Sequence, residues 1–317
     1  MRRCCHGFTL AELLVSIAVL SLLVLVASRM INSVATVATL GSKRMDADSQ
    51  VRPVLDRIAV DLTQMIKRSD VDYYFKGSDT MQGSGTVGLN DRMAFFSQAQ
   101  GYFPSPSPGS QGPVSLIAYR VNAKTTSGSF CKMERMSKGL FWSTVSPIPT
   151  PSPSPSKLFM IFGAPPTLPN NWPSAATGDP ASPSYQDRDF ELIGPQIFRF
   201  EYFYLLTDGT TTDGVPPHPP VTAAFENVAA VSVTVAAIDS TSRLLLTDCQ
   251  LGGDIACGAP YANSGLIQRL KDCDTTAAPS DLTAIWQAAL DGVTDMPRAA
   301  VSAIRIYQRY VYLSPVK

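Results

Sequence analysis

An uninterrupted apolar segment near the N-terminus constrains the fold of this chain more than any other feature. It runs from residue 8 to residue 28, contains one charged side chain, Glu12, and follows a short basic leader that ends at Gly7. About 20 apolar residues are enough for a helix to cross the hydrocarbon layer of a membrane. A carboxylate inside such a helix costs roughly 2.5–3.5 kcal/mol or more, so its presence indicates a function and a partner. The segment 8–28 is therefore predicted to be a transmembrane helix in which Glu12 is a functional residue.

The residues at this junction resemble a known processing signal. Gly7-Phe8-Thr9-Leu10, with Glu12 two positions later, is similar to the signal of type IV prepilins, which pilins and the pseudopilins of type II secretion share. The resemblance implies that a prepilin peptidase cuts after Gly7 and methylates the new amino terminus of Phe8. It also implies that Glu12 pairs with the terminal amine of a neighbouring pilin-like subunit. An ordinary signal peptide is the alternative, but the far end of this apolar segment lacks a small-x-small cleavage site.

The leader also predicts how the chain is oriented in the membrane. Arg2 and Arg3 favour a cytoplasmic leader. We therefore expect four parts: a cleaved leader at 1–7, a single span of the inner membrane at 8–28, an amphipathic helix extension at 29–69, and a periplasmic head at 70–317. An assembled extracytoplasmic filament is a further expected location.

Helical periodicity continues beyond the apolar segment. Apolar residues recur every three or four positions as far as Ile66, which predicts one long N-terminal helix. Gly41 and Pro53 predict a break or kink within it. The stretch 52–62 resembles the corresponding helix of J-type minor pseudopilins.

Beyond residue 70 the pattern changes to that of strands. Segments with a period of two or with short apolar runs are 93–97, 114–121, 130–136, 157–162, 196–206, 228–238 and 301–313. Segments 104–113, 147–156, 165–183 and 215–220 are rich in Pro and Ser and predict extended loops. Short helices are expected at 264–271 and 281–290. The predicted fold is α+β and pilin-like: a long N-terminal helix packed on an antiparallel sheet with Pro-rich loops. The strands 198–204 and 301–313 resemble those of J-type pseudopilins and of the Verru_Chthon cassette protein C family.

The exported part carries the cysteines that could form disulfides. Cys131, Cys249, Cys257 and Cys273 remain after the leader is removed, and disulfides persist outside the cytoplasm. Four cysteines allow three pairings. The pair Cys249–Cys257 is favoured because it flanks a short Gly-rich loop, and unpaired buried thiols are the alternative.

Several function classes are disfavoured by the sequence. The chain has 26 basic and 26 acidic residues, and losing Arg2 and Arg3 leaves 24 against 26, so no basic stripe indicates nucleic acid as a partner. His218 is the one histidine outside the leader and lies among prolines, which does not suit a catalytic base. The motif Gly83-x-Gly85-x-x-Gly88 lacks the following helix that a dinucleotide site needs. We therefore expect no enzyme activity and no cofactor.

The segment 208–214 offers clustered oxygens of the kind that calcium prefers. Its Asp-Gly pairs are foremost turn signals, and the regular spacing of EF-hand ligands is absent. We expect a structural turn there and no metal site.

Together these features favour a minor pilin or pseudopilin-like subunit. Removing residues 1–7 from 317 leaves a mature chain of 310 residues, which is large for a repeating subunit. A bulky head is easier to accommodate at a filament tip, where only one side must pack. The alternative is a signal-anchored extracytoplasmic enzyme or carbohydrate-binding module that uses an aromatic sheet face.

Overall fold

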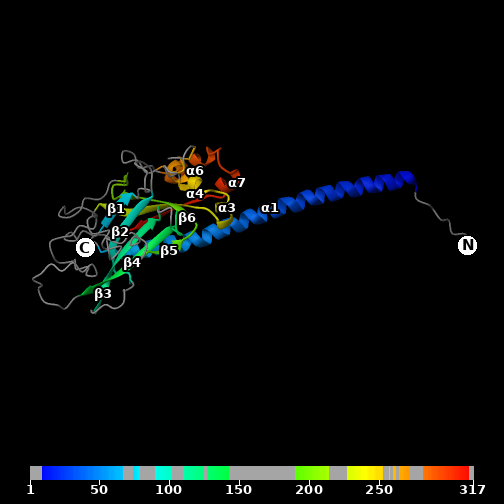
Figure 1. The fold of residues 1–317 in the computed structure, drawn as a ribbon. Helices are drawn as coiled ribbons and strands as arrows, with labels where there is room; N and C mark the ends of the chain where they lie inside the picture. Colours follow the sequence, from blue (N-terminus) through cyan, green and yellow to red (C-terminus); the bar gives the residue numbers. More distant parts are fainter. Residues whose placement is uncertain are drawn as a thin grey trace, which may run out of the picture. The chain divides into compact units, whose positions relative to one another are not determined.

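The computed structural model divides the chain into two units, Met1–Asp46 and Ala47–Lys317. It describes residues 9–66, 74–78, 90–101, 110–123, 127–142, 190–213, 227–252, 257, 260–261, 264–271 and 281–313. The first unit contains the N-terminal part of helix α1. The second unit, called the head below, contains the rest of α1, two antiparallel sheets and several short helices (Figure 1).

Helix α1 spans Leu10–Thr63 without interruption. The predicted break at Gly41 or Pro53 is therefore wrong, since both residues lie inside the helix. The predicted end at residue 69 is also wrong. The chain leaves the helix earlier because Met65 pairs with Ser97 at the edge of a sheet and the amide of Ile66 donates to the carbonyl of Phe96.

The last four turns of α1 pack on the head. Their buried side chains recur at helical spacing and are Val51, Val54, Leu55, Ile58 and Leu62. Arg52, Asp56 and Arg57 lie exposed on the other faces, as expected for an amphipathic helix. This packing explains why Pro53 is tolerated: burial of the apolar face favours the helix over the break that a proline would otherwise cause.

Sheet A has its five strands in sequence order, all antiparallel. They are β1 (Tyr74–Ser78), β2 (Asp91–Ser97), β3 (Ser110–Val121), β4 (Met133–Trp142) and β5 (Phe190–Gly194). Residues 110–113 begin β3, so the loop predicted for 104–113 is wrong at this end. A register shift between Gln111 and Ser115 accommodates Pro113, because proline cannot donate to a regular ladder.

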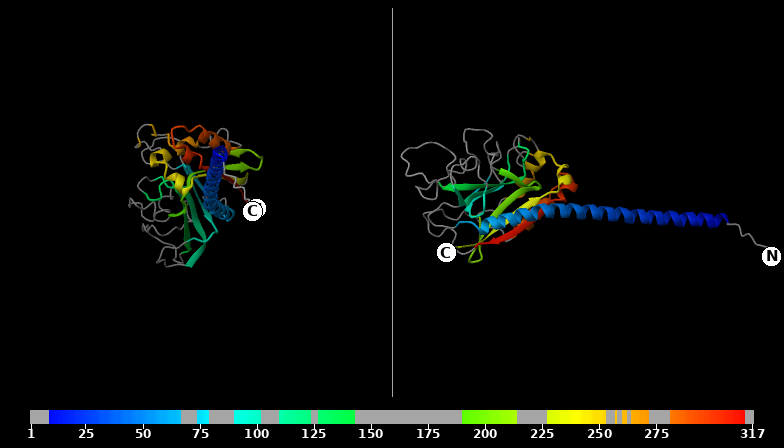
Figure 2. Two further views of the ribbon diagram at one scale, coloured as in Figure 1. Left: turned by 90° about the vertical axis from the view of Figure 1, so that its right-hand side faces the viewer. Right: turned by 90° about the horizontal axis from the view of Figure 1, so that it is seen from below.

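Sheet B has the strand order β7-β6-β8-β9, also antiparallel. Its strands are β6 (Ile197–Leu206), β7 (Thr211–Thr212), β8 (Val228–Ala237) and β9 (Arg305–Tyr312). The turn predicted from Asp208-Gly209 is present: Gly209 has φ 85°, and the carboxylate of Asp208 accepts from the amide of Thr210 at 2.8 Å. Figure 2 shows β9 beside the C-terminal part of α1.

Two apolar clusters hold the head together. The first joins the buried face of α1 to both sheets. The second lies between sheet B and the short helices of the C-terminal third. These helices are α3 (Ser240–Arg243), α4 (Asp248–Gly252), α5 (Leu266–Arg269), α6 (Leu282–Asp291) and α7 (Arg298–Val301). Sheet B is therefore covered on both faces.

The predicted elements that lie among the described residues differ from the observed ones mainly at their ends, whereas β1, β5, β7, α3, α4 and α7 were not predicted. The strand predicted from residue 130 starts at Met133, because Cys131 has φ 51° and forms part of a turn. The strand predicted from residue 301 starts at Arg305, after α7. The predicted strand 157–162 and the Pro-rich segments 147–156, 165–183 and 215–220 lie outside the described residues.

Candidate functional site

The N-terminus of α1 holds the residues that the sequence singled out. Gly7 and Phe8 lie outside the described residues. Glu12 lies exposed in the first turn of the helix, and its Oε2 accepts from both the amide and the hydroxyl of Thr9 at 2.9 Å. The amide of Glu12 donates in return to Thr9 Oγ1 at 3.3 Å. This reciprocal arrangement is a capping box, which satisfies donors that a helix start leaves free. The spacing Thr-x-x-Glu could have predicted it.

Five hydroxyl groups along the apolar helix are satisfied within the helix. Each donates to a main-chain carbonyl four residues earlier, at 2.7–3.0 Å. The side chains concerned are Ser16, Ser21, Ser33, Thr36 and Thr39. Lipid offers no hydrogen-bond partners, so a helix that crosses it must satisfy its polar groups internally.

One helix among the described residues is long and apolar enough to cross a membrane. This candidate span is Leu10–Thr39, 30 residues with every side chain exposed. A helix of that length extends about 45 Å, close to the 40–45 Å thickness of a bilayer with its headgroups. The chain is a membrane-anchored single-pass protein.

A buried ionic network joins α1 to sheet A. Asp61 is 0% exposed, and its Oδ2 accepts from Tyr119 Oη at 2.5 Å and from Arg135 Nε at 2.8 Å. Its Oδ1 lies 3.4 Å from Arg57 Nε. Burial and the charge of Asp61 raise the pKa of Tyr119, so the phenol stays protonated and acts as a donor. The sequence did not reveal this network, because Asp61, Tyr119 and Arg135 are 16 to 74 positions apart.

A second polar set joins α1 to sheet B. Tyr307 donates its hydroxyl to Asp48, and Arg309 pairs with Asp56. Arg309 and Asp56 are both substantially exposed, at 41% and 66%. The helix is thus attached to both sheets, with the buried attachment at Asp61.

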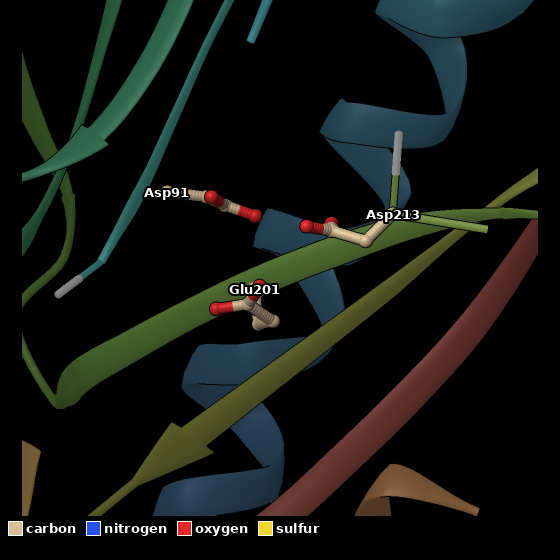
Figure 3. A group of neighbouring side chains, drawn as sticks. All are labelled: Asp91, Glu201 and Asp213. Atoms are coloured by element: carbon tan, nitrogen blue, oxygen red, sulfur yellow. The ribbon is translucent and has the colours of Figure 1, made fainter. Parts of the chain in front are cut away.

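Three carboxylates of the head lie close together. Asp91 at the start of β2, Glu201 in β6 and Asp213 after β7 have oxygens within 4.8 Å of one another (Figure 3). Carboxylate oxygens are ligands for hard cations. However, Glu201 already lies 2.8 Å from Arg199 Nη2, and Asp91 accepts from the amide of Tyr202 at 3.0 Å. Of these three residues the sequence drew attention only to Asp213. Asp91 in sheet A is far in the sequence from Asp213 and from Glu201 in sheet B.

The cysteines have different environments. Cys249 and Cys257 form a disulfide across eight positions. Cys131 is a free buried thiol, and burial raises its pKa to about 12, so it is not a reactive thiolate. Cys273 lies outside the described residues.

Reducing the disulfide should destabilise the head. Closure of a loop this short is worth roughly 2–3 kcal/mol in the free energy of unfolding, which corresponds to several degrees in Tm. Thermal unfolding of the full-length protein with and without reductant measures the shift, and a Cys249→Ser/Cys257→Ser variant should reproduce it. Thiol labelling of Cys249 or Cys257 in denatured, unreduced protein would contradict the bond.

The aromatic side chains of strand β6 lie in the hydrophobic core. This burial argues against the alternative function, in which an aromatic sheet face binds carbohydrate. The aromatic side chains of β6 are 0% exposed and are Phe198, Phe200, Tyr202, Phe203 and Tyr204. Buried rings cannot stack on a sugar. Among the described residues, the large aromatic side chains that are exposed are Tyr310 and Tyr312, in β9.

Comparison with known proteins supports the reading of the N-terminus. Residues 2–28 match the family model described as the prokaryotic N-terminal methylation motif. No curated protein matches the chain. A chain in the crystal structure of the GspK-GspI-GspJ complex from the type 2 secretion system of enterotoxigenic Escherichia coli is similar at 13% identity and a TM-score of 0.29; the alignment covers 60% of this chain and 88% of that one. The prepilin resemblance of the leader and the start of the first helix is thus confirmed over residues 2–28.

Proposed function

We propose that this chain is a minor pilin or pseudopilin-like subunit, which a prepilin peptidase cleaves after Gly7 and which joins or caps a type IV pilus or type II secretion pseudopilus. The observation that carries the proposal is the match of residues 2–28 to the methylation motif, with Glu12 in the first turn of the apolar helix. Its partners are the peptidase, other pilin-like subunits and the inner membrane. The head lies in the periplasm, as the charges of the leader favour.

The capping box gives Glu12 two alternative partners. In the single chain, Thr9 supplies the hydrogen bonds to the carboxylate. In an assembly, the methylated amine of a neighbour's Phe8 brings a positive charge to the same carboxylate. Ion pairing in lipid removes the cost of two isolated charges, whereas the bonds from Thr9 leave the carboxylate charge uncompensated. Glu12 therefore favours association of subunits over a solitary chain.

The apolar surface of α1 suits both the free subunit in the membrane and the subunit in a filament. Its side chains from Leu10 to Thr39 make no buried contact with the chain itself. They can face lipid in the free subunit and the helices of neighbours in a filament. A structural role also agrees with the single histidine left after cleavage, His218, and with the buried aromatic strand.

Replacing Glu12 by alanine should abolish assembly and leave membrane insertion intact. The substitution removes the acceptor for a neighbour's amine and makes the span more apolar. The measurement is recovery of partner proteins with methylated N-termini, identified by mass spectrometry after purification from membranes of the native host.

The matched control is Ser16→Ala, one turn further along α1, whose hydroxyl bonds only to its own helix at 2.7 Å. This variant should recover the same partners as the unmodified chain. Equal recovery from the Glu12→Ala strain would refute the charge-pairing mechanism.

A further inference from the structure

Two neighbouring leucines in the turn that follows α3 are exposed. Leu244 is 85% exposed and Leu245 48%. The turn is fixed at its start by Asp239, whose carboxylate accepts from the amides of Thr241 and Ser242 at 3.1 and 3.0 Å. At its end, the amide of Leu245 donates to the carbonyl of Ser242. These hydrogen bonds fix the backbone of the turn, in which both leucine side chains are exposed.

Arg243 fixes the same turn to the rest of the head. Its guanidinium donates to the carbonyls of Cys131 and Phe130 at 3.0 and 2.9 Å. Helix α3 also packs against α7. The segment that carries the exposed leucines is thus attached to the head through Arg243 and through α7.

The register of sheet B shows which end of the head carries these leucines. Along β9, Arg309 contacts Asp56 of α1, and Tyr307, two residues earlier, contacts Asp48. Moving back along β9 therefore leads toward the start of the head at Ala47. Arg305, the first residue of β9, pairs with Ala237, the last residue of β8. The chain passes from Ala237 into α3, so the leucines lie at the end of the head where α1 enters it.

Chain length keeps this end of the head near the bilayer. The candidate span ends at Thr39 and the head begins at Ala47. The connecting residues are helical, so they extend about 12 Å at 1.5 Å per residue. Even a fully extended connection would reach only about 29 Å. This limit holds whatever the direction of α1.

We propose that Leu244 and Leu245 insert into the interfacial layer of the bilayer that α1 spans and hold the free subunit's head against the membrane. The occupant of this surface is lipid, and its headgroup charge matters little. Arg298 of α7 is exposed and suits phosphate groups, whereas Asp248, close to the leucines, is exposed and repels them. The contact is therefore apolar and should form on zwitterionic lipid. The proposal rests on the membrane anchor and is independent of filament assembly.

Tryptophan fluorescence of the full chain in phosphatidylcholine vesicles tests the proposal. Leu244→Trp adds an indole at a position where exposure leaves room for it. The unmodified protein has three tryptophans, so the emission of the added indole is the difference between the spectra of the variant and the unmodified protein. This emission should be shifted to the blue, and it should be quenched when the lipid acyl chains carry bromine. Tyr312→Trp is the matched control, because Tyr312 is 68% exposed at the opposite end of β9; its emission should be unquenched.

Leu20→Trp, inside the span, separates the two possible failures. If Leu20→Trp is quenched and Leu244→Trp is not, the anchor holds and the lipid contact is wrong. If Leu20→Trp is also unquenched, the proposal falls together with the anchor on which it depends. A blue shift of Leu244→Trp without quenching, which grows with the ratio of protein to lipid, would assign the leucines to a second copy of the chain and overturn the proposal.

Discussion

Replacing Gly7 by valine should leave the leader attached and prevent methylation of Phe8. Glycine has no Cβ, so the backbone at the junction can approach the peptidase closely, and a branched side chain blocks that approach. Intact-mass measurement of membrane-extracted protein should show that the unmodified chain lacks residues 1–7 and carries one added methyl group. The mass of the valine variant should correspond to residues 1–317 with the substitution and without an added methyl group. Gly7→Ala should be processed poorly.

Gly41→Ala is the matched control for this measurement. Gly41 also lies in the N-terminal unit, but a Cβ there meets nothing within 4 Å, so processing should be unchanged. Retention of Met1 in protein that is otherwise assembled with partners would contradict the proposed processing. Retention of Met1 together with no recovery of pilin-like partners would favour the alternative, a signal-anchored extracytoplasmic module.

Replacing Asp61 by alanine should cost about 3 kcal/mol in the free energy of unfolding, because it leaves the buried Arg135 with only the largely exposed Glu191, 3.8 Å away, as a counter-charge. The side chains of Asp61 and Arg135 are 0% and 5% exposed, so water cannot compensate. Denaturant unfolding of the full-length protein in detergent, followed through near-ultraviolet circular dichroism, measures the change.

Asp56→Ala is the control for this loss, since it breaks the exposed pair with Arg309 and should cost only about 0–1 kcal/mol. The double variant Asp61→Ala/Arg135→Leu should recover part of the stability, because the uncompensated charge is then also removed. Equal effects of Asp61→Ala and Asp56→Ala would show that the buried network does not hold α1 on the head.

The elements that could be predicted are those whose signal lies in consecutive residues. The apolar helix and the strands β6 and β8 follow from periodicity. The predicted strands 196–206 and 228–238 correspond to the observed strands Ile197–Leu206 and Val228–Ala237. Glu12 was singled out as a candidate because a charge in an apolar segment is a local anomaly, and its functional role stays a prediction. The long helix was predicted, but the break expected at Pro53 is absent, because burial of Val51, Val54 and Ile58 stabilises the helix there.

The features that could not be predicted depend on contacts between distant residues. Asn90 accepts from the amide of Phe200 at 2.7 Å, and Asp91 from the amide of Tyr202; together they attach β2 to the edge of β6. No local pattern marks either residue for this role. The Asp61 network is of the same kind, as is the partition of the strands into two sheets.

The continuity of α1 has a mechanical consequence. One helix carries both the apolar span and the segment that packs on the head, and its two attachments, at Asp61 on one sheet and at Asp48 and Asp56 on the other, are spread along its axis. A force along the axis of the head-bound part of α1 acts on these contacts as shear and loads all of them at once. A peeling force would break them one after another and at lower tension. Within the head, this part of α1 therefore resists a force along its axis better than a force that peels it away from the sheets.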